Sequence, residues 1–564
     1  MKVTQEQLSR EEQAWREVGH TTIRRKSARV LSGCFLAVIF AVPLYQLAAE
    51  YLEARRTGQT WRPQILELAR RIPDVLAPIR DGGLRPANIV RANRNLLREI
   101  NDFEDRLNDA SLLGQYIRPR VQEWFSGWPG VGNEQAYVGR DGWLFYRPGL
   151  DYLTGPGFLD PRQLRRRAGG GDEWHAPPQP DPRPAIIDFN DQLRERGIGL
   201  IVVPVPVKPS IHPEKFSARY EGTRRQEEIP LQNASYSRLM ADLAAAGVTV
   251  FDPSELLAAR ADRPRFLATD THWRPEAMEA VAVRLAARIA DVLGAPGPGD
   301  GGLRRRPLEL AGLGDIALML DLPKGQTRFP PESVTIRQVL TADGQFWRAS
   351  KEAEVLVLGD SFSNNYSLEP MGWGESAGLV EQLSYFLHAP VDRLVRNDSG
   401  AWATRAMLAR ELARGHDRLA GKRVVVWQFA ARELVVGDWR IIPLRPGEPP
   451  PARFVVPQPG RPLTVNGTVR EAAPVPRPGT VPYRDHVTAV HLVDLPENGE
   501  AVVYMFGMED NEWTRAARLR PGEEITVRLV PWAEVADRYG GINRGELSDL
   551  ELQLQEPCWG EWVD

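Results

Sequence analysis

Short apolar runs alternate with amphipathic stretches through the middle of the chain. Residues 199–203, 248–251, 355–358 and 423–428 are rich in valine, isoleucine and leucine, as is typical of buried strands, and 391–396 is a candidate for the next strand. Stretches with apolar residues at helical spacing, among them 185–196, 236–245 and 275–293, lie between them. Strands that alternate with helices favour parallel βαβ units, so we expect an α/β domain whose strand order the pattern leaves open.

Different patterns flank this region. Residues 50–134 are charged, with apolar residues at helical spacing, and predict a helical membrane-proximal region. Residues 446–482 are rich in proline and glycine and predict a linker. From 483 to 564, short strand-like runs recur at close intervals, which predicts a small β-rich domain, either a barrel or a sandwich. The α/β domain is therefore expected over residues 135–445.

One long apolar segment lies near the N-terminus. Residues 30–49 contain no charged side chain and are long enough to span a bilayer as a helix. Basic residues between 24 and 29 precede them, which favours a cytoplasmic tail over residues 1–29. We expect a single transmembrane helix, an uncleaved signal anchor in the inner membrane, with the rest of the chain in the periplasm. A cleaved signal peptide is the alternative.

Composition narrows the class of protein. The chain has 564 residues, enough for two or three domains, and a formal net charge of −3. It has no clustered basic face, so we expect no nucleic-acid partner. Its 2 cysteines, Cys34 and Cys558, are not expected to pair, and no cysteine or histidine cluster has the spacing of a metal site. We therefore expect neither a metal nor a bound cofactor.

Two short segments carry candidate chemistry. Asp270 and His272 lie in a loop before the helix predicted from residue 275, two positions apart, so both side chains can face one site. Ser361 follows the strand 355–358 and Gly359, at a carboxyl end where open α/β sheets bind ligands. A serine nucleophile needs an imidazole to take its proton and a carboxylate to orient that imidazole. The segments together predict acyl transfer, whereas each alone also fits a polar turn or a helix cap.

The chain resembles the SGNH-hydrolase-like proteins of alginate O-acetylation, the AlgJ/AlgX type of periplasmic polysaccharide O-acetyltransferase. The resemblance covers about residues 135–445 and rests on the segments 269–273, 359–363, 142–146, 203–208 and 426–434. It implies an SGNH-like fold, with a mostly parallel sheet flanked by helices. The Asp-x-His segment precedes the serine, as in the alginate branch and unlike ordinary SGNH esterases.

The resemblance also implies residue roles and partners. Ser361 would accept the acyl group, His272 would be the general base, and Asp270 its orienting partner. The chain would transfer acetyl groups to hydroxyls of an exopolysaccharide, and the acetyl donor would be delivered by a multi-pass membrane O-acyltransferase partner. A carbohydrate acetyl-esterase and a non-catalytic glycan-binding or scaffold subunit of an export complex remain alternatives. Nothing in the sequence selects one polymer.

Four further features are weaker candidates. Asn397 follows the predicted strand at 391–396 and could donate to an oxyanion. Arg405 and Tyr366 could contact an acidic sugar, although a satisfied arginine and a packed tyrosine are the commoner situations. The glycine-containing segment 371–374 is expected to be a flexible loop that acts as a lid or contacts the acceptor.

Overall fold

The computed structural model of the chain describes residues 25–57, 61, 63–109, 111–170, 177–221, 230–259, 262–294, 302–397, 400–447, 454–476, 478–479, 481, 483–496, 499–547 and 549–563. The chain divides into two compact units, Met1–Arg118 and Pro119–Asp564. The second unit thus begins earlier than the α/β domain that the sequence predicts from residue 135.

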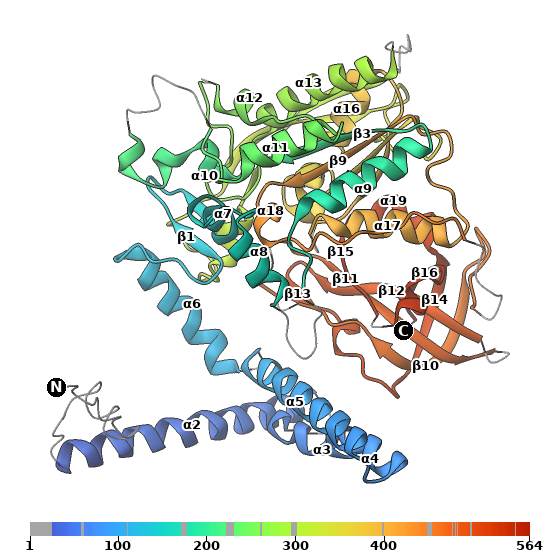
Figure 1. Ribbon diagram of the computed structural model, residues 1–564. Helices are drawn as coiled ribbons and strands as arrows, with labels where there is room; N and C mark the ends of the chain where they lie inside the picture. The colour runs from blue at the N-terminus through green and yellow to red at the C-terminus, as the bar shows by residue number, and fades with distance from the viewer. Residues whose placement is uncertain are drawn as a thin grey trace, which may run out of the picture. The chain divides into compact units, whose positions relative to one another are not determined.

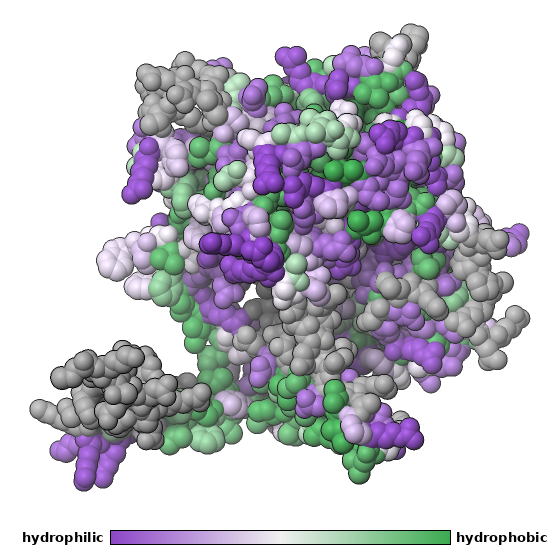
Figure 2. Space-filling model, in the orientation of Figure 1, coloured by the Kyte–Doolittle hydropathy of each residue, from purple (hydrophilic) through white to green (hydrophobic). Residues whose placement is uncertain are grey.

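The first unit is helical, as its amphipathic pattern predicts. Its helices are α2 (Arg25–Thr57), α3 (Glu67–Val75), α4 (Ala77–Gly82) and α5 (Pro86–Asp109), and α6 (Leu112–Gly127) crosses into the second unit. Within the part of the chain that the structure describes, α2 is the one helix whose length and composition would allow it to cross a membrane. Figure 2 shows hydrophobic residues on the surface of these helices, and on α2 they include Val30 and Phe35.

A five-stranded sheet organises the first part of the second unit. Its order is β4 (Thr249–Val250), β3 (Gly199–Val205), β9 (Val424–Ala430), β7 (Val355–Gly359) and β8 (Asp392–Val395). Every neighbouring pair is parallel. These are the five apolar runs that the sequence predicts as strands, so the α/β prediction is confirmed. The strand order, which the sequence left open, places β7 between β8 and β9.

Helices cover both faces of this sheet (Figure 1). One face carries α13 (Pro275–Leu293) and α16 (Leu379–Leu387), and the other carries α9 (Pro182–Glu195), α11 (Tyr236–Ala245) and α17 (Trp402–Ala413). Alternate strand residues feed the two cores: Val355 and Val357 belong to the first, Leu356 and Leu358 to the second. Because successive side chains of a strand point to opposite faces, a sheet buried on both faces needs the continuous apolar runs seen in the sequence.

Shorter elements complete this part. They are β1 (Ala136–Val138), β2 (Leu144–Tyr146), α7 (Arg147–Thr154), α8 (Pro161–Ala168), α10 (Lys208–Ile211), α12 (Ser254–Ala258), α14 (Asp315–Met319), α15 (Ser361–Asn364) and α18 (Glu433–Val436). The antiparallel pair β5 (Arg304–Gly312) and β6 (Glu332–Leu340) was not predicted. Most residues of β5 are exposed and three are consecutive arginines, so this strand lacks the apolar run that marks a buried one.

The C-terminal part is β-rich, as the sequence predicts. Its strands are β10 (Leu463–Ala472), β11 (His486–Leu495), β12 (Gly499–Glu509), β13 (Glu512–Trp513), β14 (Glu524–Pro531), β15 (Asn543–Gly545) and β16 (Pro557–Trp562), with the helices α19 (Trp532–Tyr539) and α20 (Leu550–Gln553). Pairing of β11 with β12 closes the sheet into a barrel. Strand β10 lies in the segment 446–482, which we expected to be a linker. That expectation is wrong for β10, because its residues pair with both β11 and β14.

One carboxylate, that of Glu546, joins the α/β part to the β-rich part. Oε1 of Glu546 lies 3.0 Å from Arg396 and 3.1 Å from Arg410 of the α/β part, and 3.4 Å from Arg544 of β15. Burial disfavours the charged carboxylate, but the three guanidinium groups outweigh it and lower the pKa of Glu546 to about 2. Since this pKa is lower in the folded than in the unfolded chain, the interaction stabilises the fold above the unfolded value and is lost as the pH falls.

We expect Glu546→Gln to lower the free energy of unfolding at pH 7 by about 3 kcal/mol, because two buried guanidinium groups and a partly buried one lose their counter-charge. Wild type should lose the same stability between about pH 4.5 and about pH 2, and the variant should lack that component. Urea unfolding followed across pH measures both. Glu561→Gln is the control, since Glu561 pairs with Arg528 on the surface, where both are about half exposed. Equal effects of the two substitutions would refute the role given to Glu546.

Candidate active site

The turn after β7 holds Ser361 at the carboxyl edge of the sheet. Asp360 caps α15 by accepting the N–H of Phe362 at 2.9 Å. Its carboxylate also accepts the side-chain amide of Gln428 and the N–H of Ala430, both at 2.7 Å, and so binds the turn to β9. Gln428 in return accepts the hydroxyl of Ser363 at 2.6 Å. The position of Ser361 is therefore fixed by the neighbouring strand, and its side chain is buried.

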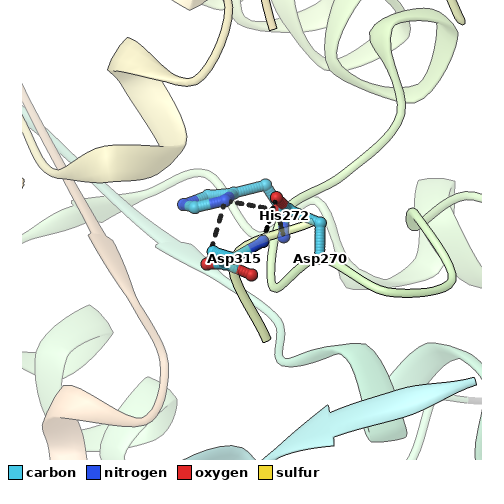
Figure 3. A group of neighbouring side chains, drawn as sticks. All are labelled: Asp270, His272 and Asp315. Carbon is cyan, nitrogen blue, oxygen red and sulfur yellow. Dashed lines mark hydrogen bonds and ion pairs between the residues drawn. The ribbon is translucent and has the colours of Figure 1, made fainter. Parts of the chain in front are cut away.

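Asp270 and His272 form a buried pair, as their spacing predicts (Figure 3). Oδ1 of Asp270 lies 2.7 Å from Nδ1 of His272 and also accepts the backbone N–H of His272 at 2.9 Å. The loop that carries them is closed by an N–H bond from Leu267 to the carbonyl of His272. Each of the two side chains is 2% exposed, so the pair is shielded from water. This arrangement orients the imidazole and favours the tautomer with the proton on Nδ1.

The second oxygen of Asp270 binds two groups that the sequence did not indicate. Oδ2 accepts the indole N–H of Trp373 at 2.8 Å and the backbone N–H of Asp315 at 3.0 Å. Trp373 is fully buried. The prediction of a flexible lid over 371–374 is therefore wrong for Trp373, whose indole belongs to the core and is hydrogen-bonded to the carboxylate. The sequence shows only a tryptophan between glycines, which does not identify its partner.

Asp315, at the start of α14, is a second carboxylate beside His272. Its Oδ1 accepts the N–H of Thr271 at 2.6 Å, and its Oδ2 lies 3.7 Å from Nδ1 of His272. Gly314 makes this approach possible, because a Cβ at that position would lie 2.2 Å from the carbonyl oxygen of Thr269. Sequence reasoning missed Asp315, since it lies far from the Asp-x-His segment and in no motif. The Gly-Asp pair at a helix start was the only local signal.

A third carboxylate and two cations lie behind this pair. Lys208 is buried and donates to the carbonyl oxygens of Leu144, at 2.8 Å, and Ala268, at 3.2 Å. Glu332 forms an ion pair with Arg274 at 3.0 Å and accepts the N–H of Ala268. Both contacts to Ala268 hold the start of the loop that carries Asp270.

Burial and charge together set the protonation of the site. Burial disfavours the imidazolium, but the carboxylates of Asp270 and Asp315 outweigh it, so the pKa of His272 is raised above its usual value. Burial and the charge of Asp270 raise the pKa of Asp315 to about 6. Burial lowers the pKa of Lys208 to about 8, against the pull of the nearby carboxylates. His272 is thus a stronger base than an isolated imidazole.

Asp270, His272 and Asp315 lie close enough together to be considered as metal ligands. The donors around Asp270 argue against that use. Its two oxygens accept four N–H groups, at 2.7 to 3.0 Å, which occupy the directions that a cation would need. The residues present therefore fit a hydrogen-bonded base better than a metal centre.

Phe362, the neighbour of Ser361 in the chain, packs against His272. The phenyl ring of Phe362 packs edge-on against the imidazole, with 4.8 Å between the ring centroids. Nε2 of His272 is buried and has no hydrogen-bond partner among the described residues, including Ser361. The serine is therefore brought to the neighbourhood of the base without a direct bond to it.

Besides the segment 371–374, the three other weaker candidates lie in different places. Asn397 follows β8 and accepts a hydrogen bond at 2.8 Å from Asn364 of α15, so it lies beside the turn of Ser361. Tyr366 is fully buried, and its hydroxyl donates to the carbonyl of Trp273 at 2.6 Å, which steadies the loop of His272. Arg405 is not brought to the site. It is buried in the core on the α17 face, 4.6 Å from the ring of Trp427, and donates to the carbonyl of Arg440.

The α/β part of the chain is similar to known proteins. Residues 136–431, just over half of the chain, match the family model of the SGNH hydrolase-like domain of the acetyltransferase AlgX. The probable alginate O-acetylase AlgJ of Pseudomonas aeruginosa is 25% identical over 320 residues, which cover 54% of this chain and 71% of the relative. The protein of the same name from Pseudomonas syringae pv. tomato is 26% identical over 242 residues, 42% of this chain and 55% of that relative.

Two solved structures are similar to the chain. The O-acetyltransferase domain of Pseudomonas putida AlgJ has a TM-score of 0.39 at 21% identity and covers 53% of this chain and 91% of its own. Pseudomonas aeruginosa AlgX has a TM-score of 0.36 at 16% identity and covers 68% of this chain and 85% of its own.

We expect Trp373→Phe to lower the free energy of unfolding through the lost hydrogen bond to Asp270, in addition to the smaller ring. A hydrogen bond to a charged group contributes about 1.5–3 kcal/mol. Trp427→Phe is the matched control: Trp427 is also fully buried, and its indole nitrogen has no partner in the described part of the chain. Urea unfolding of both variants isolates the hydrogen bond, and equal losses would show that it contributes nothing.

Proposed function

The chain belongs to the family of SGNH hydrolase-like domains of the acetyltransferase AlgX, and we propose that it transfers acetyl groups to hydroxyls of a polysaccharide through an acetyl-serine intermediate. The observation that carries the proposal is the buried Asp270–His272 pair, whose imidazole packs against Phe362 in the turn of Ser361 and whose Nε2 has no partner among the described residues. The names of the relatives favour an alginate-like acceptor.

In the first half-reaction, Ser361 attacks the carbonyl carbon of an acetyl ester. His272 takes the serine proton on Nε2, and the carboxylate of Asp270 stabilises the imidazolium that forms. The tetrahedral oxyanion needs donors at this edge of the sheet, and we assign them to the backbone N–H of Ser361 and to the side-chain amide of Asn397, whose Nδ2 lies 3.3 Å from the sulfur of Met371. The intermediate collapses, His272 gives its proton to the departing oxygen, and acetyl-Ser361 remains.

In the second half-reaction, a sugar hydroxyl gives its proton to His272 and attacks acetyl-Ser361. Collapse of the second tetrahedral intermediate returns the proton to Ser361 and releases the acetylated sugar. The direct bond between Ser361 and His272 that this scheme requires forms when substrate fills the site, since catalytic hydrogen bonds commonly tighten only in the complex. Hydrolysis differs only in that water replaces the sugar hydroxyl.

The remaining parts of the proposal concern location and donor. Helix α2 anchors the chain in the inner membrane as a single span, with the catalytic part in the periplasm. A polysaccharide is the acceptor. Because one span cannot form a passage for the donor, a multi-pass membrane O-acyltransferase delivers the acetyl group, and no bound cofactor takes part.

Full-length chain in detergent, given a chromogenic acetate ester, tests the triad. We expect Ser361→Ala and His272→Ala each to lower the release rate by roughly 10³-fold or more, and Asp270→Asn by a comparable factor. Ser210→Ala is the control, because the buried hydroxyl of Ser210 has no partner among the described residues. Acetyl groups that appear on an added polyuronate would establish transfer. Turnover that persists in Ser361→Ala would exclude the acyl-serine, and triad-dependent release to water alone would make the protein an esterase.

The pH dependence of the same reaction tests the base. We expect the rate to rise with pH as His272 loses its proton, with a midpoint above the usual imidazole value, because the two carboxylates hold the pKa of His272 up. Asp315→Asn removes one of these charges and should shift the midpoint to lower pH, while the plateau falls far less than in Asp270→Asn. An unchanged midpoint in Asp315→Asn would show that its carboxylate does not act on the base.

A further inference from the structure

A small pocket opens beside the candidate triad. Its walls include Tyr146, Lys208, Thr271, Phe362 and Arg432. Thr271 is the neighbour of His272, and Phe362 is the neighbour of Ser361, so the pocket adjoins both groups of the proposed reaction. The walls come from segments that the fold brings together at the carboxyl edge of the sheet.

Arg432 is the notable group in this pocket. It precedes α18, which lies beside α7 (Figure 1). The guanidinium carbon lies 5.3 Å from the centroid of the Tyr146 ring and 5.8 Å from that of Phe362, so two aromatic rings hold the side chain. The residue is only partly exposed.

Arg432 is within electrostatic range of Glu433, the next residue, but makes no direct contact with a carboxylate in the described part of the chain. It forms no ion pair or hydrogen bond there, whereas most arginines in this α/β part do, such as Arg305 with Glu279 at 3.1 Å and Arg393 with Glu381 at 2.9 Å. Its charge nevertheless reaches the site, because it offsets part of the rise that the carboxylates cause in the pKa of His272. A half-buried cation that is held by rings but unpaired is suited to an anion that arrives with a ligand.

We infer that Arg432 is the specificity residue of the acceptor subsite and binds the carboxylate of an acidic sugar. The inference rests on the proposed function. In a uronic acid the carboxylate is attached to the same ring as the hydroxyls that can be acetylated. A sugar whose hydroxyl lies between Ser361 and His272 therefore brings a carboxylate to the wall of the adjoining pocket. The planar guanidinium can donate two parallel N–H bonds to the two oxygens of such a carboxylate.

The assignment replaces the one suggested by the sequence. Arg405, the arginine that we expected to contact an acidic sugar, lies in the core of the α17 face. Arg432 lies at the edge of the sheet where the nucleophile is, and it follows directly from β9, the strand that also tethers the turn of Ser361.

The test compares oligomers of a uronic acid with the same oligomers after reduction of their carboxylates to neutral alcohols. With full-length chain in detergent, acetyl transfer to each acceptor is divided by the same variant's hydrolysis of a chromogenic acetate, so a general loss of activity cancels. We expect wild type to prefer the acidic acceptor and Arg432→Gln to lose that preference by about tenfold or more, since a hydrogen-bonded charge pair is removed. Arg432→Lys, which keeps the charge without the planar fork, should retain part of the preference.

Arg305→Gln is the matched control, because Arg305 also lies over aromatic rings, 4.5 Å from Tyr385, but has a counter-ion of its own. It should keep the wild-type preference. An equal preference in wild type and Arg432→Gln, or no preference in wild type, would overturn the inference.

Equilibrium binding of the two oligomers, followed by calorimetry, separates this inference from the proposed function because it needs no turnover. If binding depends on the carboxylate and is lost in Arg432→Gln, while turnover persists in Ser361→Ala, the proposed reaction is refuted and the proposed subsite is supported. If both oligomers bind equally well, while turnover is lost in Ser361→Ala, the proposed subsite is refuted and the proposed reaction is supported.

Discussion

The buried carboxylate of Asp270 is the interaction on which the site depends. Its two oxygens accept N–H groups from His272, Asp315 and Trp373, which come from three segments widely separated in the chain. A buried ionised carboxylate is costly unless donors satisfy it, so these segments must meet for the fold to be stable. The same contacts that offset the burial of Asp270 therefore orient the imidazole. In this site, stability and preparation for catalysis have one physical origin.

Local patterns in the sequence predicted the parts of the site that local structure determines. The apolar runs gave the strands, and Gly359 before Asp360 and Ser361 marked the turn at the carboxyl edge. The spacing of Asp270 and His272 sufficed to predict their pairing, because two residues of a short loop can meet without help from the rest of the fold. What the pattern could not supply was the order of the strands, since five parallel runs can be arranged in several ways.

Contacts made by distant residues were missed or misassigned for a related reason. Trp373 was expected in a lid and Arg405 near a sugar, yet both side chains are buried. Helices pack on both faces of this sheet, each over its own core. The apolar pattern of an amphipathic helix shows that the helix packs on the sheet, but not on which of the two faces. Arg405 belongs to the α17 face, away from the turn of Ser361. Asp315 had no motif at all, and its role depends on the close approach that Gly314 permits.

The charges around His272 explain why this buried imidazole can act as a base. The carboxylates of Asp270 and Asp315 favour the imidazolium, and together they outweigh both burial and the opposing charge of Arg432. Transfer of a proton from a hydroxyl to Nε2 therefore places a positive charge beside two carboxylates, where little water screens their attraction. The same attraction raises the pKa of His272. A stronger base accepts a hydroxyl proton more readily.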